Sequence, residues 1–302
     1  FPESTNTSGI EIGTTIFKGS YLLNKVTYSK SVKLTPNELI NGARNVKEIV
    51  IPEGLSFVRE GDMLYNAAGD TIIYTYAKPA DNILVVPAGV TAIGNYAFKG
   101  QTEITKAYIP DTVQYIGEYA FFGNSALEEV FFYKTKDDGA GNIEADLDSN
   151  GNYQTNPIPS LLTIGKAAFA NCKSLKTFVI PSSVTNINNH AFYKCASLGS
   201  TATQEKPFIL PSTVKNYGNY AFAYTGLTYV KFTGDYIDTS VGEYFFANTP
   251  NIKKVDFNIA KTKIERVYDS MFHTSGIREI DLKGIKFLGR YYFTNARIKE
   301  IT

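Results

Sequence analysis

The sequence predicts a repeat solenoid, a fold in which short, similar units stack along one axis. The first observation is an Ala-Phe pair that returns at Phe98, Phe121, Phe169, Phe192 and Phe222. The second is a Leu-x-x-apolar-x-apolar run in most units, whose alternation is typical of a half-buried strand. One unit of about 23 residues cannot bury its own apolar face, so the units must stack to form a continuous core.

Each predicted unit has the same order of elements. The strand comes first, and an apolar-Pro pair such as Ile109-Pro110 ends it, because Pro removes a backbone donor. An Ile-Gly pair such as Ile116-Gly117 follows, and then Ala-Phe. Parallel strands need connections that cover the other face of their sheet. We therefore expect the segment around Ala-Phe to form a short helical turn or an irregular connection.

The full pattern, I-P-x-x-V-x-x-I-G-x-x-A-F-x-x-C-x-x-L, resembles the BspA-like class of leucine-rich repeat. Residues 180–198, IPSSVTNINNHAFYKCASL, match it with one departure, Asn188 in the place of Gly. The resemblance runs from about residue 46 to the end of the chain. It implies a right-handed stack with one parallel β-sheet face. It also implies a bacterial protein, secreted or at the cell surface, whose theme is adhesion to host or extracellular-matrix proteins.

The chain is predicted to have two regions. Residues 1–29 lack the repeat and are expected to cap the open end of the sheet, where unpaired backbone groups would otherwise be exposed. Residues 30–302 form the solenoid, with an inserted hairpin over 62–76 and a polar insertion over 133–157. The chain begins without Met or an apolar leader, so we expect any signal or anchor to lie outside it.

The composition and the absence of known motifs argue against several classes of function. The formal net charge is +1, from 30 basic and 29 acidic residues, whereas a general nucleic-acid binder needs a basic excess. No apolar run approaches the ~20 residues that span a bilayer. The sequence holds no G-x-S-x-G, P-loop or H-E-x-x-H motif, so we predict no enzyme and no cofactor. A pair of catalytic carboxylates from distant units is left open.

The two cysteines, Cys172 and Cys195, each lie three residues after the Phe of their unit. Mostly small or amide side chains take this position in other units, which predicts buried free thiols. A disulfide is left open, because adjacent units bring the two residues close together. Zinc needs about four ligands, and only His190 and His273 are available, so we predict no zinc site.

The polar insertion contains a weak calcium candidate in Asp146, Asp148 and Asn150, which are followed by Gly151. Alternate oxygen ligands before a Gly resemble the first half of an EF-hand loop. Pro157 stands where the closing Glu would be, and half a motif supplies too few ligands. An ordinary polar loop is therefore the favoured interpretation.

The outward positions of the repeat strands are the predicted working surface. In residues 175–180, Phe178 and Ile180 point inward, so Thr177 and Val179 point outward. Such positions are mostly apolar or aromatic in the first six units and mostly charged afterwards, and a contiguous apolar surface often marks a partner site. β-propensity alone, or the insertion folding over this surface, would explain the same residues. The predicted partner-binding residues are Tyr108, Phe131, Val179, Ile209, Tyr229, Lys231, Lys254 and Asp256.

These observations predict a non-catalytic module that binds a protein with the outer face of the repeat sheet, and the resemblance implies a host or extracellular-matrix protein as the partner. The alternative is a carbohydrate-binding module whose exposed tyrosines stack on the sugars of a glycan. The chain has 21 Tyr for that purpose, although it has no Trp.

Overall fold

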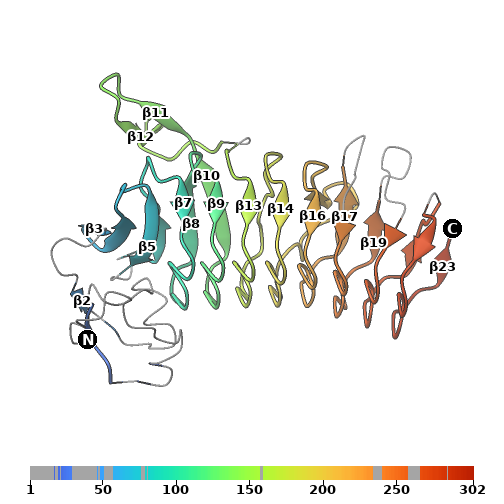
Figure 1. Ribbon diagram of the computed structural model, residues 1–302. Coiled ribbons are helices and arrows are strands. Elements are labelled where there is room, and N and C mark those ends of the chain that lie inside the picture. Colours follow the sequence, from blue (N-terminus) through green and yellow to red (C-terminus); the bar gives the residue numbers. More distant parts are fainter. Residues whose placement is uncertain are drawn as a thin grey trace.

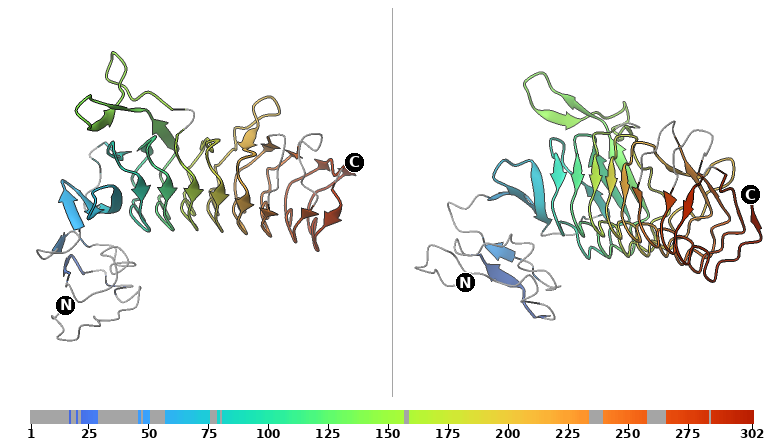
Figure 2. Two further views of the ribbon diagram at one scale, coloured as in Figure 1. Left: turned by 45° about the horizontal axis from the view of Figure 1, so that its top comes forward. Right: turned by 45° about the vertical axis from the view of Figure 1, so that its right-hand side comes forward.

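The computed structural model describes residues 17, 20, 22–28, 46, 48–50, 57–75, 79, 81–156, 159–233, 240–257, 266–283 and 285–302. Successive turns of the chain, here called rungs, stack side by side along one axis (Figure 1). Two series of parallel strands run along this stack, and the two further views in Figure 2 show the same arrangement. The predicted solenoid of leucine-rich-repeat type is confirmed.

Sheet 1 is formed by the repeat strands that the sequence predicts. In its two halves the outward positions align as predicted, since Tyr108 pairs with Phe131, and Ile209 with Lys231. Between the halves, residues 175–180 keep only an isolated bridge from Thr177 to Glu129. The strands are, in the first half, β6 (Ile83–Val85), β8 (Lys106–Pro110) and β10 (Glu129–Tyr133), and in the second half β15 (Phe208–Leu210), β17 (Tyr229–Phe232), β19 (Lys254–Asp256), β21 (Glu279–Ile280) and β23 (Glu300–Ile301).

Sheet 2 is a second parallel series, in addition to the one sheet face that was predicted. Its short strands lie at the Ile-Gly position of each unit, and their Ile side chains enter the core. The Gly that follows is required because successive rungs approach closely here: a Cβ on Gly117 would lie 2.5 Å from the backbone of Gly94. The strands are β5 (Thr71–Thr75), β7 (Ala92–Ile93), β9 (Tyr115–Ile116), β13 (Thr163–Ile164), β14 (Asn186–Ile187), β16 (Asn216–Tyr217) and β18 (Ser240–Val241), and the separate pair β20 (Arg266–Val267) and β22 (Phe287–Leu288) continues the pattern.

The core is a ladder of the repeat Phe residues. Phe169 is fully buried, and its ring lies 5.0 Å from Phe121 and 5.4 Å from Phe192, nearly parallel to both. Ile and Leu side chains of the two sheets pack against these rings. Burying apolar surface along this ladder stabilises the stack by about 25 cal/mol for each Å² that is removed from water.

The segments around Ala-Phe form turns, and no helix occurs among the residues that the structure describes. Their amides alternate between two kinds of acceptor. In one rung the amide of Tyr193 donates to the carbonyl of His190 within the turn, whereas the amide of Phe192 donates to Ala221 of the next rung. A helical turn would keep all these bonds local, so the inter-rung bonds explain why the expected helical turn does not form.

The start of the chain adds antiparallel pairing. β3 (Phe57–Glu60), β4 (Met63–Asn66) and β5 form an antiparallel series, and β5 then pairs in parallel with β7, the next strand of sheet 2. Further back, β1 (Lys25–Thr27) pairs in parallel with β2 (Glu48–Val50). Most of the predicted cap over 1–29 lies outside the described residues, so its boundary stays a prediction.

The polar insertion stands off one edge of the solenoid as a hairpin of β11 (Thr135–Asp137) and β12 (Ile143–Ala145) (Figure 1). Asp111, which directly follows β8, holds its base. The carboxylate of Asp111 accepts hydrogen bonds from Thr135 Oγ1 at 2.5 Å and from Asn156 Nδ2 at 2.7 Å. Both ends of the insertion are therefore tied to one solenoid side chain.

Candidate partner-binding groove

A groove of about 540 Å³ opens on the outer face of sheet 1, over β15, β17 and β19. It is here called the sheet 1 groove. The three strands hold its floor in register, because each outward side chain lies beside its counterpart on the next rung. The residues that line it include Gln204, Glu205, Pro207, Ile209, Tyr229, Lys231, Lys254 and Asp256.

A threonine of the next rung helps to hold the loop that contributes Gln204 and Glu205. Thr228 Oγ1 lies 2.6 Å from the carbonyl oxygen of Ala202 and 3.1 Å from that of Gly199, and it donates to them. The amide of Lys206 donates in turn to Thr203 Oγ1. The loop is therefore fixed beside the strands.

The floor of the groove combines charged, aromatic and apolar groups. Lys231 Nζ lies 3.5 Å from Asp256 Oδ2, and both side chains are more than 40% exposed. Lys253 Nζ lies 5.5 Å from the ring centroid of Tyr229, a distance that permits a cation–π contact. Ile209 is 41% exposed beside them. These groups can pair with charged, aromatic and apolar side chains of another molecule.

An acidic surface continues from the groove toward the end of the described solenoid. A second hollow of about 320 Å³ lies over β19, β21 and β23. Lys254 pairs in register with Glu279, and Glu279 with Glu300. The acidic side chains that line this hollow are Asp256, Glu279, Asp281 and Glu300. The surface thus changes from mixed charge to mainly negative charge along the stack.

The structure thus gathers five of the eight predicted partner-binding residues in one groove and leaves three outside it. Tyr108 and Phe131 stack on each other at 5.3 Å, and Tyr153 of the insertion packs on Tyr108 at 5.0 Å. Val179 lies in the interrupted segment of sheet 1 and is 77% exposed. The insertion therefore covers part of the apolar column, which is one of the explanations that the sequence left open.

Sequence reasoning did not find Gln204 and Glu205 of the groove wall, and it placed Pro207 on the outer face without including it among the partner-binding residues. A signal was present, because Phe192 and Phe222 are 30 residues apart, whereas a unit has about 23. The spacing indicates an inserted loop. It does not say that the loop turns toward sheet 1.

The two cysteines are free and buried. Cys172 Sγ donates to the carbonyl oxygen of Phe121 at 3.1 Å, and Cys195 Sγ donates to that of Phe169 at 3.0 Å. Burial raises the pKa of both thiols. A protonated, buried thiol is a poor nucleophile, so these residues serve the fold by satisfying turn carbonyls.

The calcium candidate lies at the tip of a tight turn. One carboxylate oxygen of Asp148 accepts hydrogen bonds from the amides of Asn150 and Asn152, and these bonds lower the pKa of Asp148. Asp138 makes the same contacts with Ala140 and Asn142 in the neighbouring turn. Over the described ranges, no group of three or more His, Cys, Asp or Glu side chains could hold a metal ion. The contacts of Asp148 suit the ordinary polar loop that the sequence favours, and the weak calcium candidate stays an untested alternative.

No helix in the described part of the chain is long and apolar enough to cross a membrane. The family model "BspA type Leucine rich repeat region" matches residues 4–67, 71–199, 142–266 and 201–302. No curated protein matches the chain.

A solved leucine-rich repeat structure is similar to this chain in fold. A leucine rich cell surface protein from Faecalibacterium prausnitzii has a TM-score of 0.53 at 19% identity, over 82% of this chain and 54% of its own. This chain thus spans about half the length of that protein. The T. pallidum leucine rich repeat protein has a TM-score of 0.45 at 15% identity, over 82% of this chain and 90% of its own. The pneumococcal vaccine antigen PcpA has a TM-score of 0.41 at 14% identity, over 94% and 73%.

Proposed function

We propose that this chain, which belongs to the BspA type leucine-rich repeat family, is a non-catalytic module that binds a protein in the sheet 1 groove. We further propose that it acts at the bacterial surface or after secretion, on a host or extracellular-matrix protein. The observation that carries the proposal is the convergence of Ile209, Tyr229, Lys231, Lys254 and Asp256 in one open groove.

The kinds of side chain in the groove support a protein partner. Energetically dominant interface residues are often aromatic or cationic side chains inside a pocket with a polar rim. Here Tyr229 and Ile209 offer apolar area, and Lys254 offers a cation. The exposed Lys231–Asp256 pair contributes only about 0–1 kcal/mol to folding, so either partner can exchange it for a charge on another protein.

The same groove suits a sugar less well. Stacking a sugar needs an open aromatic face, and Lys253 occupies the space over Tyr229. The covered Tyr108 offers no open face either, because Phe131 and Tyr153 contact its ring. We therefore assign the sheet 1 groove to a polypeptide segment. Basic residues of that segment would lie toward β21 and β23, over the acidic hollow.

The test is a binding measurement with immobilised plasma and extracellular-matrix proteins, followed by titration of each protein that is retained. We expect Tyr229→Ala and Lys254→Ala each to weaken binding by about 10- to 100-fold, the range of hot-spot residues. The matched controls are Tyr291→Ala, at a Tyr that is 71% exposed and lies outside the groove, and Lys173→Ala. If the groove variants bind like the wild type, or if no protein is retained, the proposal is wrong.

A further inference from the structure

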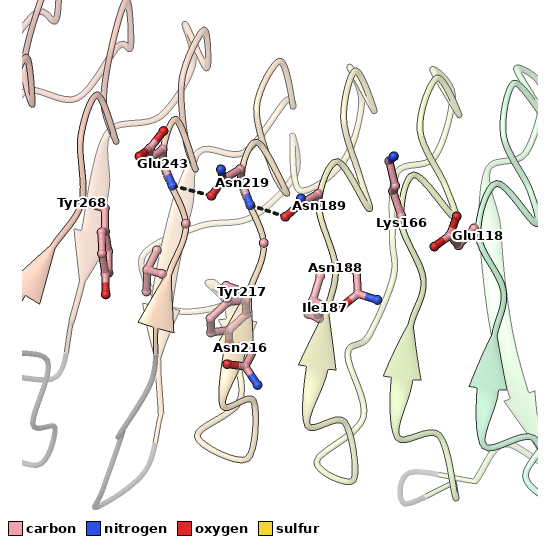
Figure 3. A pocket seen from close by; sticks show the side chains of 13 residues that line it. Glu118, Lys166, Ile187, Asn188, Asn189, Asn216, Tyr217, Asn219, Glu243 and Tyr268 are labelled. Atoms are coloured by element: carbon pink, nitrogen blue, oxygen red, sulfur yellow. Dashed lines mark hydrogen bonds between the residues drawn. The ribbon is translucent and has the colours of Figure 1, made fainter.

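A second open hollow, of about 560 Å³, lies on sheet 2, at the ends of β14, β16 and β18. It is here called the glycine trough, because Gly218 and Gly242 line it at two successive rungs. Lys166 and Glu118 lie at one end of the trough and Tyr268 at the other (Figure 3). The trough is independent of the sheet 1 groove, since the two share no lining residue.

The repeat pattern changes at the borders of the trough. A Cβ on Gly218 would lie 2.2 Å from the backbone of Asn189, and one on Gly242 would lie 2.5 Å from that of Asn219, so neither rung can carry a side chain there. Asn188 and Tyr268 take the same position on the flanking rungs and do carry side chains. Gly218 and Gly242 thus let these rungs approach their neighbours closely, whereas the flanking rungs carry side chains at this position.

A row of side-chain amides borders the trough, and the fold fixes their orientation. Asn189 Oδ1 accepts a hydrogen bond from the amide of Asn219 at 2.9 Å, and Asn219 Oδ1 accepts one from the amide of Glu243 at 3.0 Å (Figure 3). Because each amide oxygen is engaged with the next rung, each Nδ2 group remains to donate to a ligand. The spacing of these donors is that of successive rungs, about 4.8 Å.

Acceptors and one cation complete the polar lining. Glu243 and Glu118 provide carboxylate oxygens, and Lys166 provides an ammonium group. Two carboxylates against one ammonium give a formal charge of −1, which disfavours an anionic ligand. Fixed donors beside acceptors suit hydroxyl groups, because a hydroxyl both donates and accepts.

The aromatic residue Tyr268 lines the end of the trough. Other tyrosines near this surface stack on each other, such as Tyr220 and Tyr244 at 4.6 Å with an angle of 3° between their planes. Their facing surfaces are therefore filled. Tyr268 is half-buried and stacks on no ring in the part of the chain that the structure describes. A tyrosine offers an apolar ring and a polar hydroxyl, which together suit the two sides of a sugar.

We infer that the glycine trough binds a neutral oligosaccharide, with Tyr268 against a sugar ring and with Asn189, Asn219 and Glu243 bonded to its hydroxyl groups. A saccharide site commonly combines an apolar surface with a few convergent polar groups, and the trough supplies both. The trough lies on sheet 2, whereas the sheet 1 groove lies on the other series of strands. Occupation of the trough does not depend on the proposed protein partner.

The experiment is saturation-transfer difference NMR of the whole chain with four neutral hexasaccharides: cellohexaose, maltohexaose, xylohexaose and hexa-N-acetylchitohexaose. We expect at least one to bind, and Tyr268→Ala to weaken that binding at least tenfold. Tyr268→Phe keeps the ring and is expected to bind nearly as well as the wild type, which separates loss of the ring from loss of the fold.

Two controls make the result specific. Tyr291→Ala removes an exposed tyrosine outside the trough, and Tyr229→Ala alters the sheet 1 groove; both are expected to leave saccharide binding unchanged. The inference is overturned if none of the four sugars binds at millimolar concentration, or if Tyr268→Ala binds as the wild type does. Binding of a polyanionic saccharide such as heparin in place of the neutral ones would also overturn it.

Discussion

The two halves of sheet 1 use the same strand position for different surfaces. In the first half, Tyr108 and Phe131 stack at this position, and Tyr153 of the insertion packs on Tyr108. In the second half, Lys231 and Asp256 pair at the same position and remain exposed to solvent. The outward residues are apolar where the insertion packs on them, so apolar character alone does not identify a binding surface.

The junction between the halves shows what holds the solenoid together. Sheet 1 is interrupted at residues 175–180, where only the Thr177–Glu129 bridge remains. Sheet 2 is continuous through the same rungs, because β13 pairs with both β9 and β14. The Phe ladder also passes through without a break. Core packing and sheet 2 thus carry the connection that sheet 1 lacks.

The largest expected effect comes from breaking the ladder at that junction. Phe169→Ala removes a fully buried ring that contacts Phe121, Phe178 and Phe192. We expect the free energy of unfolding to fall by about 3–5 kcal/mol, the usual cost of Phe to Ala in a core. Because solenoid rungs contact mainly their neighbours, we also expect guanidinium unfolding to separate into two transitions.

The matched variant for this experiment is Phe169→Leu, which retains most of the volume and is expected to cost about 1–2 kcal/mol. Its unfolding should stay in one transition. A single transition for Phe169→Ala would show that sheet 2 and the inter-rung bonds of the turns couple the two halves without this ring.

The next effect concerns the two buried thiols at the same junction. Burial raises the pKa of Cys172 and Cys195, so the folded chain keeps both protons where the unfolded chain, with a thiol pKa of about 8.5, releases them. The contribution of the two protonated thiols to the free energy of unfolding is therefore fully present below about pH 8.5. It falls above that pH by up to about 1.4 kcal/mol per pH unit for each thiol.

Urea unfolding under reducing conditions at pH 7, 8.5 and 9.5 measures this loss. The double variant Cys172→Ser with Cys195→Ser is the control, because a hydroxyl can donate to the same carbonyls and does not titrate in this range. Buried tyrosines also lose stability as the unfolded chain begins to ionise toward pH 9.5, but this contribution is the same in the double variant, so the difference between the two proteins isolates the thiols. An equal pH dependence in the double variant would contradict the assignment.

Most of the fold prediction rests on the regular spacing of buried residues in the sequence. Phe121, Ile116 and Leu127 mark repeated buried positions, and stacking follows from their spacing. Sheet 2 was missed because two-residue strands are too short to show alternation. The Gly after each Ile was its only local sign, since Gly permits close approach of two backbones. The turns around Ala-Phe depend on bonds to the next rung, which a single unit does not reveal.

The candidate site was partly predictable for a similar reason. Ile209, Tyr229 and Lys231 follow from strand alternation, because neighbouring rungs place equivalent residues side by side. The groove wall depends on a bond between Thr228 and a loop 26 residues before it. The cover over Tyr108 depends on Tyr153, 45 residues later in the chain. Neither contact has a periodic signal, so only the structure reveals them.

The smallest expected effect tests whether the insertion is the cover that distinguishes the two halves. Asp111→Ala removes the carboxylate that binds Thr135 and Asn156, and loss of such charged hydrogen bonds costs about 1–2 kcal/mol. We expect amide exchange in residues 134–156 to accelerate about tenfold, while the rungs beyond residue 159 exchange as before. Asp281→Ala is the control, because Asp281 accepts a hydrogen bond from the nearby amide of Lys283 and lies on the uncovered half. If both variants leave exchange in 134–156 unchanged, the tyrosine contacts alone hold the cover, and Tyr153→Ala becomes the change that should expose Tyr108.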